Sequence, residues 1–109
     1  MTGRDAALKL TLAAMAQVEI YTTRYCGYCH SAKALLTRKG IAFVEIDVSG
    51  DPEGRDKMVE RANRRMTVPQ IFIGSTHVGG SDELHALNRA GKLDGLLAAE
   101  GITQGESST

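Results

Sequence analysis

Two cysteines three residues apart, Cys26 and Cys29, lie where a strand pattern gives way to a helix pattern. Over residues 17–23, apolar side chains alternate with other residues, which is the two-residue period of a β-strand. Residues 30–39 instead carry an apolar stripe at helical spacing, and Gly40 supplies a typical helix end. Cys26 is therefore expected at a strand-to-helix junction, which restricts the chain to folds in which a helix directly follows a strand.

A second strand and a second helix are predicted next. Apolar and acidic residues alternate over residues 44–48, and a helix between two such strands implies a right-handed parallel crossover. Asp51 has the character of a helix N-cap, with Pro52 at the first helical position. The inward stripe of this helix is expected to comprise Met58, Val59, Ala62 and Met66.

The C-terminal half predicts a hairpin followed by two helices. A strand over residues 68–73 opens with Pro69, and the turn at residues 74–75 leads into an antiparallel partner strand. Ser81 is expected to cap the next helix, and a last short helix is expected over residues 93–99. The whole pattern predicts an α/β fold with a four-stranded mixed sheet flanked by helices.

Length and composition exclude several kinds of protein. A chain of 109 residues suits one domain. Its 13 Lys and Arg residues balance its 13 Asp and Glu residues, so no net field favours nucleic acid or an anionic membrane as partner. No apolar run approaches the roughly 20 residues that span a bilayer. A disulfide closing so short a loop would add little stability, so we expect a catalytic or metal-binding cysteine pair, not a structural one, in a cytoplasmic protein.

The domain itself is expected to cover residues 15–100. Residues 1–14 make a poor signal peptide and are interpreted as an N-terminal extension, either not native or weakly ordered. Residues 101–109 are polar and small, which favours a disordered tail.

The order of these motifs resembles the glutaredoxin family of the thioredoxin-like fold. The likeness runs from about Gln17 to Ala99 and is closest to the small bacterial dithiol members. It is carried by residues 18–22 (VEIYT), 26–30 (CGYCH), 32–36 (AKALL), 67–73 (TVPQIFI) and 79–82 (GGSD). Several separate motifs in the same order make this far more specific than a lone Cys-x-x-Cys.

The resemblance implies a redox-active centre and a glutathione site. Cys26 matches the nucleophile and Cys29 the resolving thiol. The positions that match the family's glutathione-binding residues are Tyr28, Arg65, Thr67, Val68, Pro69, Gly80, Ser81 and Asp82. Pro69 matches the family's cis proline, and Arg65 a position that faces the glycyl carboxylate.

Three positions depart from the family pattern. Thr23 stands where members commonly carry Lys or Arg for the glycyl carboxylate, and Arg24 comes one place later, so which basic residue takes that role is open. Gly27 replaces the more usual proline inside the motif. Ser81 stands where many relatives have a third cysteine.

The position of Cys26 suits thiol–disulfide exchange. A helix N-terminus directs free N–H groups and the positive end of the helix dipole at the sulfur, which stabilises thiolate over thiol. A stabilised thiolate gains little as an attacking group, but it leaves a mixed disulfide faster. We therefore expect a glutathione-dependent thiol-disulfide oxidoreductase, with glutathione as reductant, that reduces protein disulfides and glutathione mixed disulfides. Such an enzyme serves electron transport and cell redox homeostasis.

Other interpretations of the cysteine motif carry different predictions. With His30 the motif also spells a c-type haem attachment sequence, but the α/β pattern and the poor signal peptide disfavour it. A zinc site lacks suitably spaced ligands, and the absence of tryptophan disfavours a thioredoxin. The alternative function is a carrier or sensor in which Cys26 of two chains and two glutathiones hold a [2Fe-2S] cluster, motivated by Gly27. Without a cluster the protein is expected to be a monomer with no metal.

Overall fold

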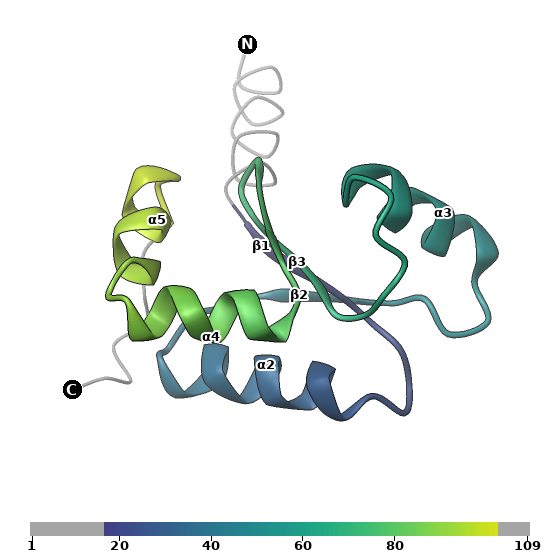
Figure 1. Ribbon diagram of the computed structural model, residues 1–109, viewed down its shortest axis with the longest axis horizontal. Helices are drawn as coiled ribbons and strands as arrows, with labels where there is room; N and C mark the ends of the chain where they lie inside the picture. Colours follow the sequence, from purple (N-terminus) through teal and green to yellow (C-terminus); the bar gives the residue numbers. More distant parts are fainter. Residues whose placement is uncertain (1–16, 103–109) are drawn as a thin grey trace, which may run out of the picture.

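The computed structural model describes residues 17–102. Along the chain the elements are β1 (Val18–Thr22), α2 (Gly27–Arg38), β2 (Val44–Asp47), α3 (Pro52–Arg61), β3 (Gln70–Ile73), β4 (Thr76–Gly79), α4 (Ser81–Arg89) and α5 (Leu93–Ala99). Helices α2 and α4 lie together on one side of the sheet, and α3 lies apart from them (Figure 1).

One mixed sheet holds the four strands in the order β2-β1-β3-β4. Strand β1 pairs in parallel with β2 and antiparallel with β3, and β3 pairs antiparallel with β4. The predicted α/β fold with a four-stranded mixed sheet is thereby confirmed. Because β1 is an inner strand, the loop that follows it places Cys26 near the middle of the sheet, at the end where β1 finishes.

The two faces of the sheet carry separate apolar clusters, as the period of a strand requires. On one face, Ile20 of β1 and Ile71 of β3 are fully buried together with apolar residues of α2, α4 and α5. On the other face, Tyr21 and Phe72 pack with Met58 of α3. The helix that begins at the cysteine motif is thus fixed to the sheet by its own buried residues Ala32, Leu35 and Leu36, which lie within the stripe predicted over residues 30–39.

Two local predictions were wrong. Met66 does not belong to the buried stripe of α3, because the helix ends at Arg61 and the Met66 side chain is 67% exposed. Asn63 and Arg64 adopt positive φ angles of 54° and 72°, which turns the chain out of helical spacing before Met66. Ser81 does not cap α4 either: Gly80 occupies the N-cap position and its N–H donates to Glu83 Oε1 at 2.7 Å.

The predictions for the two ends concern residues that are largely outside those described. Residues 1–14 lie wholly outside, and so does the tail after Ile102. Ile102 itself packs against the core, and its N–H donates to the Leu97 carbonyl at 2.9 Å. Within residues 17–102, no helix is long and apolar enough to cross a membrane.

Candidate active site

Cys26 is the N-cap residue of α2, with extended backbone angles of φ −138° and ψ 108°. Its Sγ accepts the N–H of Cys29 at 3.1 Å, so the sulfur satisfies one of the unpaired donors that every helix N-terminus presents. From the thiol form, Sγ also donates to the carbonyl oxygen of Val68, 3.7 Å away. The cysteine is partly exposed, and an attacking or leaving sulfur can therefore approach it.

Cys29 differs sharply from Cys26, because it lies inside the first turn of α2 and is 2% exposed. Burial, followed by the hydrogen bond with Cys26, raises the pKa of Cys29 to about 12 from the ordinary 9.0. The backbone of Thr23 and the positive charge of Lys33 act in the opposite direction on this pKa. At neutral pH Cys29 is consequently a buried thiol, and Cys26 is the more accessible of the two cysteines.

A hollow of about 230 Å³ lies in the region of Cys26 and collects the rest of the predicted site. Its lining includes every residue assigned to glutathione by resemblance: Tyr28, Arg65, Thr67, Val68, Pro69, Gly80, Ser81 and Asp82. Glu83, which the sequence did not single out for the site, completes it. The Val68–Pro69 peptide bond is cis, as predicted.

A fully buried glutamine supports the loop before Pro69. The amide nitrogen of Gln70 donates to the carbonyl oxygen of Thr67 at 2.9 Å and contacts its Oγ1 at 3.2 Å. The amide oxygen of Gln70 accepts from Nε2 of His77 at 2.7 Å. Because Gln70 is 0% exposed and all its polar atoms are engaged, it holds the Thr67 backbone at the rim of the hollow.

The opposite wall of the hollow is the N-terminus of α4. Glu83 accepts the Gly80 N–H, and this bond chiefly lowers the pKa of its carboxyl group. The same carboxylate lies 3.6 Å from Nη1 of Arg65. This ion pair connects the loop after α3 to the start of α4. This side of the hollow thus combines the first turn of α4, with Ser81 and the carboxylates of Asp82 and Glu83, and the guanidinium of Arg65 from the loop after α3.

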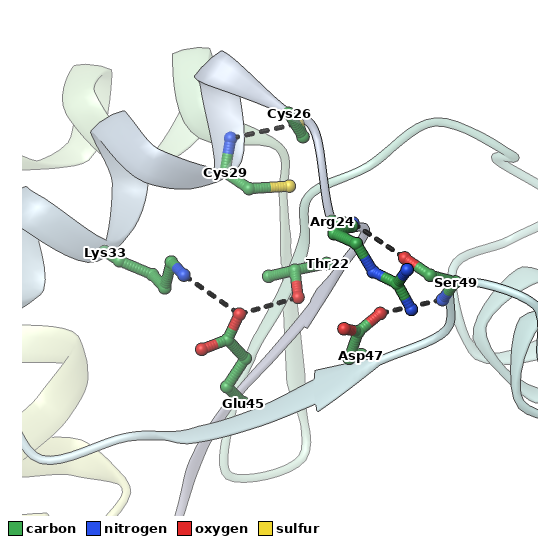
Figure 2. Close-up of polar contacts among 8 residues, drawn as sticks. All are labelled: Thr22, Arg24, Cys26, Cys29, Lys33, Glu45, Asp47 and Ser49. Carbon is green, nitrogen blue, oxygen red and sulfur yellow. Dashed lines mark hydrogen bonds and ion pairs between the residues drawn. The ribbon is translucent and has the colours of Figure 1, made fainter.

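Thr23, which departs from the family pattern, and the neighbouring Arg24 lie elsewhere. Thr23 and Arg24 line a different hollow, of about 350 Å³, together with Tyr25, Ser49 and Gly50. The Arg24 N–H donates to Ser49 Oγ at 2.7 Å, and the Arg24 side chain extends beside Ser49 and Asp47 (Figure 2). Arg65, not Arg24, is the basic residue that the structure brings to the hollow containing Tyr28 and Pro69.

Three polar side chains lie below the cysteines, between α2 and the sheet (Figure 2). Glu45 Oε2 of β2 accepts from Nζ of Lys33 at 2.9 Å and from Oγ1 of Thr22 at 2.8 Å. Both bonds lower the pKa of the Glu45 carboxyl group, with Lys33 as the larger cause. We refer to Thr22, Lys33 and Glu45 as the polar cluster. The sequence contained one signal for it, since Lys33 is one helical turn after Cys29.

Comparison with known proteins establishes the family to which this chain belongs. The glutaredoxin family model matches residues 18–78. The chain is 59% identical over 85 residues to a glutaredoxin of Pseudomonas aeruginosa, covering 78% of this chain and 100% of that one. It is 53% identical to glutaredoxin 3 of Escherichia coli K12 over 83 residues, 76% of this chain and 99% of that one. The chain belongs to the glutaredoxin family.

Solved glutaredoxin structures agree in fold. The solution structure of the Brucella melitensis glutaredoxin is 60% identical, with a TM-score of 0.67 over 76% of this chain and 89% of that one. The buckwheat glutaredoxin–glutathione complex is 27% identical, with a TM-score of 0.72 over 90% and 93% of the two chains. As a glutaredoxin with both cysteines of the motif, the protein is a thiol–disulfide oxidoreductase of the thioredoxin-like fold.

Proposed function

We propose that this glutaredoxin uses glutathione as its reductant and reduces both protein disulfides and glutathione mixed disulfides. The observation that carries the proposal is the hollow in the region of Cys26, where all eight residues assigned to glutathione by resemblance come together. The similarity to the buckwheat glutaredoxin–glutathione complex supports the same ligand. Sequence resemblance and geometry are independent arguments here, because the eight residues come from four separate segments of the chain.

The hollow offers groups that complement each part of glutathione. The guanidinium of Arg65 suits a carboxylate, since it can form charge-assisted hydrogen bonds. The N-terminus of α4, with Ser81 and Asp82, suits the γ-glutamyl end, which carries both a carboxylate and an ammonium group. The backbone of Thr67 and Val68 lies between these ends, where the cysteinyl portion would pair.

The proposed chemistry begins at Cys26. Its thiolate attacks one sulfur of a protein disulfide, forming a mixed disulfide and releasing the other protein sulfur as a thiolate. Cys29 then loses its proton to water and attacks Cys26, closing the Cys26–Cys29 disulfide and releasing the reduced protein. Two glutathiones reset the pair and leave as glutathione disulfide, so two electrons pass from glutathione to the substrate.

Mixed disulfides with glutathione require only Cys26. Cys26 attacks the protein-bound glutathione, the protein thiolate leaves, and a second glutathione attacks the glutathione sulfur. Cys26 is then the leaving group, and the Cys29 N–H bond to its sulfur stabilises the departing thiolate. Cys29 does not participate in this sequence of steps.

Single cysteine replacements test the scheme. We expect Cys29→Ser to retain turnover of a glutathionylated peptide within about threefold, but to lose nearly all reduction of insulin disulfides, because closure of the internal disulfide is blocked. Cys26→Ser is expected to abolish both reactions. Both rates are measured in a glutathione-coupled assay. Full activity of Cys26→Ser in either reaction would overturn the proposal.

The cluster-carrying alternative is tested by a spectrum of the same protein. In the described part of the chain no three His, Cys, Asp or Glu side chains gather, so a [2Fe-2S] cluster at Cys26 would need ligands from a second chain and from glutathione. Visible absorption after anaerobic reconstitution with iron, sulfide and glutathione, together with a dimer by size exclusion, would favour the carrier function. A colourless monomer would favour the reductase.

A further inference from the structure

We propose that Lys33, held in place by Glu45 and Thr22, is a positioning residue for the second thiol: its charge stabilises the Cys29 thiolate when Cys29 attacks the mixed disulfide on Cys26. This inference rests on the proposed function for its biological step, the resolution of protein mixed disulfides. It assigns a function to the polar cluster, which the resemblance left without one.

The location of the cluster carries the first part of the argument. Lys33 follows Cys29 by one helical turn, so both side chains lie on the same face of α2. Figure 2 shows the Cys29 sulfur, the Lys33 ammonium and the Thr22 hydroxyl in the same space between α2 and the sheet. The charge of Lys33 favours the thiolate of Cys29, against the burial that disfavours it.

The way Lys33 is held carries the second part. A lysine ammonium on a four-carbon stem is mobile unless it is bound. Glu45 binds it at 2.9 Å, in a pair whose side chains are 30% (Lys33) and 39% (Glu45) exposed. Glu45 also accepts the hydroxyl of Thr22, a residue that is 1% exposed, so one end of the pair is anchored to the sheet. Thr22 ends β1, the strand that leads to Cys26, so the cluster connects the sheet directly to the helix that carries both cysteines.

The chemical requirement for such a group is specific to Cys29. Cys26 has the helix N-terminus to stabilise its charge, whereas Cys29 is buried and its ionisation is opposed by its surroundings. During resolution the proton of Cys29 passes to water, the sulfur forms a bond to Cys26, and the substrate sulfur leaves with the electron pair of the broken bond. A fixed positive charge near Cys29 stabilises the anion before the new bond takes up its charge.

The reactivity of Cys29 alone provides the direct test. The chain has two cysteines, so in a Cys26→Ala background exchange with a dipyridyl disulfide reports Cys29 only. Removing one nearby charge in Lys33→Met should lower the thiolate fraction about tenfold. A more basic thiolate is also a better nucleophile, which recovers about threefold of the tenfold loss in rate. We therefore expect roughly threefold slower exchange. The rate is measured at several pH values below about 9, where ionisation of Cys29 does not destabilise the fold, and the rate of Lys33→Met should stay at about one third of the wild-type rate throughout.

Other charged groups determine the controls. Cys26 acts on the charge of Cys29 and is removed in the Cys26→Ala background. Glu45 of β2 contacts Lys33 directly, while Arg24 and Asp47 lie beside Ser49 (Figure 2). Lys33→Arg keeps the positive charge and should restore the rate of Lys33→Met towards wild type. Glu45→Gln keeps an oxygen for Lys33 and Thr22 but removes a negative charge, so exchange should become no slower than wild type. Lys39→Met removes a different ion pair of α2, with Asp94, and should leave the rate unchanged.

Activity separates this inference from the proposed function. With Cys26 present, Lys33→Met should slow reduction of insulin disulfides about threefold while turnover of a glutathionylated peptide, which bypasses Cys29, is unchanged. If wild type itself shows no glutathione-linked turnover, the proposed function fails but the exchange rates of Cys29 still decide the role of Lys33. Equal rates for Lys33→Met and wild type would overturn the inference. So would equal slowing by Lys33→Met and Glu45→Gln, which would indicate a packing role.

Discussion

Gly79 is the residue where backbone conformation and the binding hollow are most directly linked. It ends β4 with φ at +115°, in the region that favours glycine, and a Cβ there would lie 2.9 Å from Nη1 of Arg65 and 3.0 Å from Oε1 of Glu83. We expect Gly79→Ala to lower the free energy of unfolding by about 1–2 kcal/mol through backbone strain. Displacement of Arg65 and Glu83 should also raise the KM for glutathione more than it lowers kcat.

Denaturant unfolding and steady-state kinetics measure these two effects. Gly95→Ala is the matched control, because Gly95 is within α5 and nothing lies within 4 Å of an added Cβ. That variant should be as stable as wild type or slightly more so. A Gly79→Ala protein with wild-type stability and KM would contradict the account.

At the scale of single residues, motif positions could be predicted and supporting contacts could not. The residues around the hollow were identified because they stand in ordered motifs, and the structure brings all of them together. The sequence pattern at Glu83 indicates no more than an acidic residue at the start of a helix, yet its carboxylate accepts the Gly80 N–H and lies 3.6 Å from Arg65. The supporting contacts of Gln70 and Glu45 could not be predicted, because their partners lie in other strands or helices and no local sequence pattern indicates them.

At the scale of the element, the first turn of α2 makes its own prediction. Gly27 occupies the first helical position, where proline fits because the N–H has no partner within the helix. Cys26 is already extended, as a residue before proline prefers, and a Cβ on Gly27 would meet nothing within 4 Å. We expect Gly27→Pro to raise the free energy of unfolding by about 0.5 kcal/mol. The Cys26 sulfur should keep its bond, because its donor is the Cys29 N–H.

Thermal and denaturant unfolding measure the stability of Gly27→Pro, and the rate of Cys26 exchange with a small disulfide measures its reactivity. Destabilisation by more than about 1 kcal/mol would indicate that the glycine is required by the backbone. An unchanged fold with unchanged Cys26 reactivity would show that Gly27 is not needed for the helix or for the sulfur.

The order and type of the described elements could be predicted because the patterns are strong and local. The period-two runs gave β1 and β2, and the N-cap at Asp51 with Pro52 gave the start of α3. The end of α3 could not be predicted, because it depends on positive φ angles at Asn63 and Arg64, which are not glycines. Met66 was consequently assigned to a helix face that ends before it.

At the scale of the whole molecule, the sheet and its two apolar faces place one partly exposed and one buried thiol at the same helix end. Cys26 caps α2 at the surface, while Cys29 is enclosed by the packing of α2 on the sheet. The sequence places Cys29 one turn after Cys26, but the extent of its burial, 2% exposed, depends on the tertiary packing. A buried ionisable thiol couples the redox centre to the stability of the whole fold.

This coupling predicts how the stability of the reduced protein changes with pH. The pKa of Cys29 is about 12 in the native protein and close to 9.0 without its surroundings, so between these values the unfolded chain releases a proton that the native protein retains. The free energy of unfolding therefore falls as pH rises above about 9, by about 1 kcal/mol at about pH 10 from this group alone. Cys29→Ala should show a shallower alkaline decline in urea unfolding, and so should the oxidised protein, which has no thiol to titrate. Parallel declines in the reduced wild type and Cys29→Ala would mean that burial of Cys29 does not oppose its ionisation.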